Sequence, residues 1–276
     1  MPARGATVEY RGVTKRYPGG ALALDELTLE VPAGAICALV GPSGGGKTTA
    51  LKTVNRLVEP TSGQVLIDGV DVLREDPVLL RRRIGYVIQQ VGLFPHRTIA
   101  ENVATVPELV GWDRERVRAR VTELLDLVGL DPADYGTRYP SQLSGGERQR
   151  VGVARALAAE PPVMLMDEPF GAVDPIVRER LQDEFLRIHE RLGMTVLFVT
   201  HDIDEAIKMG DRVAVLRAGR LVQYAPPAEL LTTPADGFVR EFVGLDRWMR
   251  RLELLSAAGV PEVERALARL RESVRP

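Results

Sequence analysis

The stretch that most constrains the fold is an apolar run that ends in a glycine-rich loop containing a lysine. Residues 35–41 read AICALVG and are followed by PSGGGKTT at 42–49. An unbroken apolar run of this length is typical of a strand buried on both faces, as in a parallel sheet covered by helices. The spacing G-x-x-x-x-G-K-[ST] after such a strand indicates a loop whose backbone N–H groups surround phosphates. The sequence therefore predicts a strand, a phosphate-binding loop and a helix.

The loop residues are expected to contact different parts of ATP. Lys47 supplies a positive charge at the β and γ oxygens, and the Thr48 hydroxyl is a ligand for Mg²⁺. A glycine-rich turn with an incidental lysine is the alternative, which the flanking strand and helix disfavour. The expected ATP contacts from this loop are Gly41, Ser43, Gly44, Gly46, Lys47, Thr48 and Thr49.

Two further apolar runs end in polar residues. They read VMLMDEP at 163–169 and TVLFVTHD at 195–202. Between them, Pro175 to Leu192 has apolar residues at steps of three and four, as does the segment from Val117 to Val128, and both patterns predict amphipathic helices. The alternation of strands and helices predicts an α/β fold with a mainly parallel sheet and phosphate chemistry at the carboxyl ends of its strands. The phosphate loop is the motif of the P-loop NTPase type.

One long stretch departs from this alternation. From about residue 90 to about residue 160 the sequence contains no convincing buried strand, so we expect a helical subdomain inserted into a main domain that spans residues 1–245. Residues 246–276 again have a helical pattern, with Trp248, Leu252 and Leu255 on one face. They are expected to form a short helical tail.

A pair of acids ends the second apolar run. Because successive side chains of a strand point in opposite directions, Asp167 and Glu168 need not share a role. Asp167 is suited to a Mg²⁺ site beside Thr48, and Glu168 to the general base that activates water. An Asp-Glu pair at a strand end is by itself more often a solvated turn, but the phosphate loop favours the catalytic interpretation.

A second candidate phosphate site is LSGGERQR at residues 143–150. Ser144, followed three residues later by Glu147, predicts a capped helix start. Gly145 and Gly146 leave the N–H groups of the first turn exposed at the positive end of the helix dipole, which is an anion site. Because one chain would then have two phosphate sites, we expect the loop of one copy and the Ser144 turn of another to enclose the same ATP.

Together these motifs resemble those of ABC transporter ATPase subunits, over about residues 5–245. GPSGGGKTT resembles Walker A, VMLMDE resembles Walker B, and LSGGERQR resembles the signature motif, although Glu147 replaces the more usual Gln. The resemblance implies an ATP-hydrolysing homodimer with Mg²⁺ and with ATP at the interface. It also implies that His201 contacts the γ-phosphate, that Gln89 is a Q-loop catalytic residue and Mg²⁺ ligand, that Asp174 belongs to the D-loop, and that Tyr17 stacks on adenine.

A closer resemblance is to the ATPase subunits of osmoprotectant importers. It depends on YVIQQVGLFPHRTIAENVATVPELVGW at 86–112, on the segment from RYPSQLSGG to AVDPI at 138–176, and on FVREFVGLDR at 238–247. The resemblance implies import of glycine betaine, choline or carnitine. The implied partners are integral membrane permease subunits and, indirectly, an extracytoplasmic solute-binding protein, at the cytoplasmic face of the plasma membrane. Many such subunits continue into CBS domains, and none is expected here.

Other classes of function remain as alternatives. An importer ATPase for another solute, such as an amino acid, would have much the same core motifs. An ABC ATPase that acts on DNA or ribosomes is less favoured, because the sequence has one phosphate loop, one cysteine and no long heptad pattern. A nucleotide-binding regulator that does not hydrolyse ATP is disfavoured by the presence of both Glu168 and His201.

The net charge limits which partners are expected, and the cysteine content indicates the redox state of the compartment. The formal net charge of -2 offers no general attraction to nucleic acid, so no nucleic-acid partner is expected. The arginines at 81–83 and 114–120 are expected to be solvated or to serve as docking charges. Cys37 lies within an apolar run and is expected to be a buried thiol in a reducing compartment. No signal peptide or membrane-spanning segment is expected.

Overall fold

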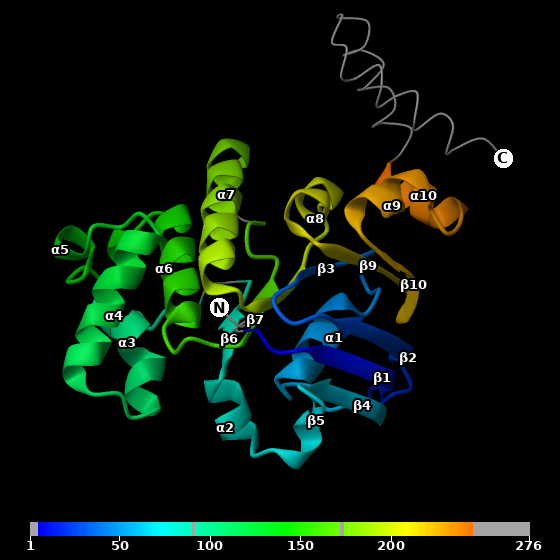
Figure 1. Cartoon of the computed structure of the whole chain (residues 1–276), viewed down its shortest axis with the longest axis horizontal. Coiled ribbons are helices and arrows are strands. Elements are labelled where there is room, and N and C mark those ends of the chain that lie inside the picture. The colour runs from blue at the N-terminus through cyan, green and yellow to red at the C-terminus, as the bar shows by residue number, and fades with distance from the viewer. Residues whose placement is uncertain (1–4, 90–91, 172–173, 245–276) are drawn as a thin grey trace, which may run out of the picture.

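A computed structural model of the chain describes residues 5–89, 92–171 and 174–244 (Figure 1). The expected tail at 246–276 therefore lies outside the described residues. The larger sheet has six strands in the order β10-β9-β3-β8-β7-β6. Its strands are β3 (Ile36–Val40), β6 (Ile84–Val87), β7 (Val163–Asp167), β8 (Thr195–Val199), β9 (Arg212–Arg217) and β10 (Arg220–Ala225).

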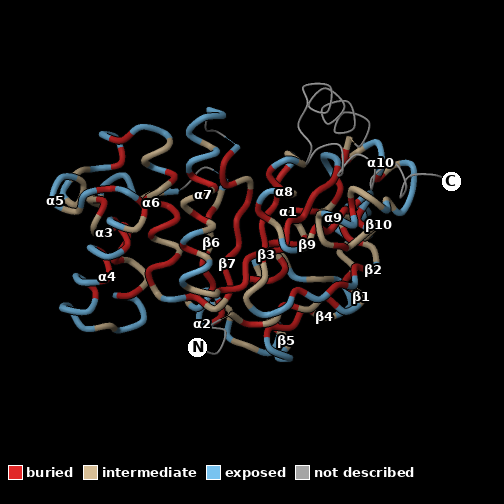
Figure 2. The backbone as a smooth tube through the Cα atoms, turned by 45° about the horizontal axis from the view of Figure 1, so that its top comes forward, coloured by how far each residue is buried: buried red, intermediate tan, exposed pale blue. Residues whose placement is uncertain are grey.

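The three apolar runs identified in the sequence are β3, β7 and β8, and every residue of these strands is buried (Figure 2). β3 pairs in parallel with β8 and β9, and β7 pairs in parallel with β6 and β8. The predicted α/β fold with a mainly parallel sheet is confirmed. The pairing of β9 with β10 is antiparallel, which the sequence patterns did not predict.

The two faces of β3 belong to two separate apolar cores. Cys37 and Leu39 pack in a cluster with the residues of helix α1 (Lys47–Val54), whereas Ala38 and Val40 pack in a cluster with the helices of the opposite face. Cys37 is fully buried, and burial raises its pKa to about 12, so the prediction of a buried core thiol is confirmed.

A second, smaller sheet was not predicted. It is antiparallel and has the strand order β2-β1-β4-β5, formed by β1 (Val8–Arg16), β2 (Leu22–Val31), β4 (Ser62–Ile67) and β5 (Val70–Asp71). Its apolar side chains share a core with α1, so α1 lies between the two sheets. The pairing of β1 with β2 has register shifts near Gly12 and Glu26, both with positive φ, and such bulges interrupt the alternation that would identify a strand.

Helices without an intervening strand occupy the described residues between β6 and β7. They lie together on one side of the molecule (Figure 1). They are α3 (Ile99–Leu109), α4 (Arg114–Leu127), α5 (Pro132–Tyr135), the 3₁₀ turn η2 (Pro140–Gln142) and α6 (Gly145–Leu157).

The remaining helices connect or flank strands. The predicted helix at 175–192 is confirmed as α7 (Pro175–Leu192), which joins β7 to β8. Among the described residues, no helix combines the length and the apolar character that crossing a membrane requires. The other elements are η1 (Val72–Arg74), α2 (Pro77–Arg82), α8 (Ile203–Met209), α9 (Pro227–Thr232) and α10 (Gly237–Val243).

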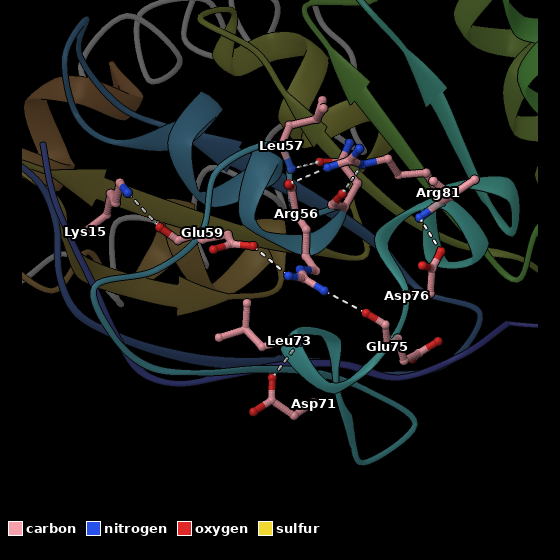
Figure 3. A network of polar contacts seen from close by, with 11 residues as sticks. Lys15, Arg56, Leu57, Glu59, Asp71, Leu73, Glu75, Asp76 and Arg81 are labelled. Atoms are coloured by element: carbon pink, nitrogen blue, oxygen red, sulfur yellow. Dashed lines mark hydrogen bonds and ion pairs between the residues drawn. The ribbon is translucent and has the colours of Figure 1, made fainter.

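The expectation that the arginine clusters are solvated is wrong for Arg120, which is 7% exposed. Its guanidinium donates to the carbonyl oxygens of Leu157 and Ala158 at the end of α6, because helical spacing places Arg120 on the inner face of α4. Arg81 is exposed, but it donates to the carbonyl oxygens of Asn55 and Arg56 just after α1 (Figure 3). Both arginines thus bond to carbonyl groups at helix ends.

Candidate active site

The loop between β3 and α1 is shaped by close backbone contacts. A Cβ at Gly41 would lie 2.0 Å from the Leu216 carbonyl oxygen, and one at Gly46 would lie 2.4 Å from the Ala23 carbonyl oxygen. Gly44 also has positive φ, yet a Cβ there would meet nothing within 4 Å, so this part of the loop faces open space. α1 has no side-chain cap at its start, which leaves its first N–H groups available to an anion.

Lys47 points back into the loop. The residue is 8% exposed, and its Nζ donates to the carbonyl oxygens of Gly41 at 2.7 Å and Pro42 at 3.0 Å. Burial lowers the pKa of Lys47, and the charges of Glu168 and Asp167 partly oppose that shift. The ammonium group is thus fixed between the loop and the two acids at the end of β7.

Thr48 and Asp167 lie together although they are distant in sequence. The Thr48 hydroxyl donates to Asp167 Oδ1 at 3.0 Å, and Lys52 Nζ lies 4.0 Å from Asp167 Oδ2. Asp167 is 7% exposed, and burial raises its pKa, partly offset by the Thr48 bond and the Lys52 charge. Lys52 was not predicted from the sequence, although it follows Thr48 by one helical turn and therefore shares its face.

This pair of oxygen donors fits Mg²⁺, which binds proteins through one or two carboxylates and completes its shell with water and phosphate oxygens. Within the described residues, no group of three or more His, Cys, Asp or Glu side chains could hold a metal ion by itself. A Mg²⁺ ion beside Thr48 and Asp167 would therefore need water or phosphate oxygens as further ligands.

Glu168 lies between two polar side chains from other parts of the chain. Gln89 Nε2 donates to Glu168 Oε2 at 3.0 Å, and His201 Nδ1 lies 3.6 Å from Glu168 Oε1. The backbone of Glu168 is left-handed, with φ 48°, so its carboxylate leaves the direction of β7 while Asp167 stays in the strand. Such strain in a residue other than glycine occurs often at functional sites. The structure thus brings Gln89, Glu168 and His201 together.

The Ser144 turn is a capped helix start, as the sequence predicted. Ser144 Oγ accepts from Glu147 N at 3.3 Å, and the Glu147 carboxylate accepts from Ser144 N at 2.7 Å. The Tyr135 hydroxyl donates to Glu147 at 2.6 Å, and this bond, together with those from Ser144, lowers the pKa of Glu147 to about 2. Gly145 and Ser144 are both exposed.

The Ser144 turn lies apart from the phosphate loop in the same chain. In Figures 1 and 2, α6 lies with α3 and α4 on one side of α7, whereas α1 and β3 lie on the other side. Asp174 caps the start of α7 by accepting from Val177 N at 3.1 Å. A groove of about 250 Å³ between the starts of α6 and α7 is lined by Ser144, Gly146 and Val177 among others. The Ser144 turn and the first turn of α7, which Asp174 caps, thus line one groove.

Tyr17 lies just after β1, 37% exposed, with Lys15 Nζ 5.2 Å from its ring centroid. Its partly open ring could stack on a base. Among the described residues, no hydrogen bond, ion pair or ring contact joins Tyr17 to Gln89, Glu168 or His201.

The fold and the site define a P-loop nucleotide-binding protein, in which a buried strand leads into a glycine-rich loop with a lysine and a carboxylate pair ends a neighbouring part of the same sheet. More narrowly, the chain belongs to the ABC transporter family, whose model matches residues 24–171. It is 57% identical over 240 residues to the osmoprotectant import ATP-binding protein OsmV of Salmonella typhimurium, covering 87% of this chain and 63% of the relative. It is 54% identical over 235 residues to the glycine betaine/carnitine/choline transport ATP-binding protein OpuCA of Bacillus subtilis, covering 85% of this chain and 62% of the relative.

The fold is also similar to that of solved structures. A dimeric post-hydrolysis state of the ATP-binding cassette MJ0796, bound to ADP and Pi, is 35% identical and has a TM-score of 0.72, covering 80% of this chain and 98% of that chain. The chain therefore spans less than two thirds of the length of the first curated relatives, but nearly all of this cassette.

Proposed function

We propose that this chain is the ATP-hydrolysing subunit of an ABC importer for quaternary ammonium osmoprotectants such as glycine betaine, choline or carnitine. The observation that carries the enzymatic part is the placement of Glu168 between Gln89 and His201, next to the Lys47 loop. The names of the relatives support the class of solute. The proposed location is the cytoplasmic face of the plasma membrane, where the chain would bind integral membrane permease subunits. An extracytoplasmic solute-binding protein would deliver the solute to those subunits.

In this proposal, the phosphates of ATP lie in the loop from Gly41 to Thr49, with Lys47 at the β and γ oxygens. Thr48, Asp167 and Gln89 would hold Mg²⁺, whose chemistry is to neutralise charge on those oxygens. Glu168 accepts a proton from water as the water oxygen bonds to the γ-phosphorus and the bond to the ADP oxygen breaks. His201 donates a hydrogen bond to the γ-phosphate, and Tyr17 stacks on adenine.

The separation of the two phosphate sites supports a homodimer. Since α6, which begins at Gly145, lies apart from α1 in one chain, the Ser144 turn would contact the γ-phosphate from a second copy. Asp174, beside the same groove, would then also face the partner. Two ATP molecules would be bound at the interface, and their hydrolysis would open it. No nucleic acid takes part.

The test is uptake of labelled glycine betaine, choline and carnitine by cells that contain the intact gene or a Glu168→Gln copy. A matched control is Glu190→Gln, the same chemical change on the exposed side of α7. Loss of uptake with Glu168→Gln, and normal uptake with Glu190→Gln, would support both parts of the proposal.

The alternative is an importer ATPase for another solute. The chain is also 47% identical over 245 residues to the sulfate/thiosulfate import ATP-binding protein CysA of Caulobacter vibrioides, covering 86% of this chain and 70% of the relative. Similarity of this degree therefore extends across classes of solute. Unchanged uptake of all three compounds, with ATPase activity intact in the purified chain, would refute the osmoprotectant assignment and leave ATP hydrolysis standing.

A further inference from the structure

A buried carboxylate lies one helical turn after His201 and has no role in the proposed chemistry. Glu205, in the first turn of α8, is 6% exposed, and burial raises its pKa. Its carboxylate accepts from the Thr200 hydroxyl, and from Gln182 Nε2 at 3.4 Å. A buried carboxylate is destabilising unless hydrogen bonds compensate its lost hydration, so these bonds account for its presence in the interior.

The bond to Thr200 is part of a short chain of hydrogen bonds that includes the residues on both sides of His201. Thr200 is 2% exposed, and its N–H donates to the Leu39 carbonyl oxygen at 3.3 Å. Because its hydroxyl proton is directed to Glu205, a lone pair of the same oxygen is free to accept from Asp202 N, at 3.0 Å. The residue before His201 and the residue after it are therefore connected through one buried hydroxyl.

The same turn is attached to α7. Asp202 Oδ1 accepts from Asp204 N at 2.9 Å, and Asp202 Oδ2 lies 3.3 Å from Arg178 Nη1 on α7. Gln182, which donates to Glu205, lies one helical turn after Arg178 and on the same face of α7. Two bonds from α7 thus hold the turn from Thr200 to Glu205.

The imidazole itself has little packing to hold it. The His201 side chain is 66% exposed, and its Nδ1 lies 3.6 Å from Glu168 Oε1, slightly beyond an ordinary hydrogen bond. An exposed ring has several rotamers available, so its distance from the reacting phosphate depends on where the backbone places it. That backbone is the part of the turn which Thr200 and Glu205 hold.

We propose that Glu205 is a positioning residue for His201, and that its hydrogen bond to the Thr200 hydroxyl holds the imidazole beside Glu168. The proposal deepens the proposed ATPase function and rests on it for every effect on rate. The claim about the placement of His201 can be measured without any turnover.

The first experiment follows the histidine imidazole signals by NMR in the full-length chain with ATP and Mg²⁺. The sequence has three histidines, His96, His189 and His201, so a His201→Ala variant assigns the signal. We expect Thr200→Val and Glu205→Ala each to shift or broaden the His201 signal and to leave the other two in place. Thr200→Ser and Glu205→Gln, which keep the hydroxyl and an acceptor oxygen, should retain the wild-type signal.

The second experiment measures ATPase kinetics of the same variants. We expect Thr200→Val and Glu205→Ala to lower kcat about tenfold and to change KM for ATP less than about twofold, because His201 acts on the γ-phosphate and not on the rest of the nucleotide. Thr200→Ser and Glu205→Gln should restore kcat to within about threefold of wild type.

Thr195→Val is the matched control, since Thr195 is fully buried at the opposite end of β8 and its hydroxyl donates to the Ala6 carbonyl oxygen at 2.6 Å. It loses a comparable buried hydrogen bond and should retain the His201 signal and kcat. A His201 signal that is unchanged in folded Thr200→Val and Glu205→Ala would overturn the proposal, as would equal losses in the Thr195→Val control. A wild-type chain without ATPase activity would refute the ATPase function alone, because the NMR comparison would still test whether Glu205 positions His201.

Discussion

Replacing Arg120 by Met should strongly destabilise the fold, although Arg120 has no role in the proposed nucleotide site. The arginine is 7% exposed, and it donates from Nη2 to the Leu157 carbonyl oxygen at 3.1 Å and from Nε to the Ala158 carbonyl oxygen at 3.4 Å. Leu157 and Ala158 are fully buried. Methionine fills the space of the arginine stem but leaves these carbonyl groups without their donor.

The magnitude follows from these two bonds. A hydrogen bond from a charged donor to a buried carbonyl contributes about 2 kcal/mol at the shorter distance, and about 1 kcal/mol at the longer one. The ion pair with Glu123 adds at most about 0.5 kcal/mol, because the Glu123 side chain is 51% exposed. The free energy of unfolding should therefore fall by about 3 kcal/mol.

Urea unfolding followed by circular dichroism measures this loss. Arg118→Met is the control, because Arg118 lies on the same helix but is exposed, and its change should stay within about 0.5 kcal/mol. Arg120→Lys, which retains the charge but not the two-pronged donor, should give about half the loss. A loss below about 1 kcal/mol for Arg120→Met would refute the reasoning, since it would mean that other donors or water satisfy the two carbonyl groups.

Three further predictions concern the phosphate sites. Gly46→Ala should weaken ATP binding at least about 100-fold, since its Cβ would meet the Ala23 carbonyl oxygen at 2.4 Å. Gly44→Ala, with open space around it, should weaken binding less than about tenfold. Equal effects of the two variants in titrations with a fluorescent ATP analogue would contradict this prediction. Glu168→Gln should retain ATP and elute as a dimer with Mg²⁺ from a sizing column, and elution as a monomer would count against the shared site. Tyr135→Phe should lower stability above about pH 5, because it removes the hydrogen bond that most lowers the pKa of Glu147. A carboxyl group whose pKa is lower in the folded state stabilises the fold at pH values above its unfolded pKa, and that effect is lost as the pH falls toward about 2. The difference from wild type should therefore close between about pH 4.5 and about pH 2, and a pH-independent difference in thermal unfolding would exclude this cause.

Features that depend on neighbouring residues could be predicted from the sequence. The phosphate loop follows from glycine spacing after an apolar strand, and the start of α6 follows from Ser144 and Glu147 three residues apart. The buried strands β3, β7 and β8 follow from unbroken apolar runs. Backbone preference and side-chain periodicity act over a few residues, so such patterns remain visible in one sequence.

Contacts between groups that are distant in sequence depend on the tertiary structure. Thr48 and Asp167 are 119 residues apart, and Gln89 and Glu168 are 79 apart, so the strand order of the sheet sets both contacts. The antiparallel sheet was not predicted, because bulges interrupt the alternation of buried and exposed residues along its strands. The roles of Arg120 and of Thr200 with Glu205 were invisible because a polar residue in a sequence does not reveal whether packing will bury it. Burial and hydrogen-bond partners are properties of the packed chain, and they decide whether such a residue stabilises the fold, positions another side chain or only contacts water.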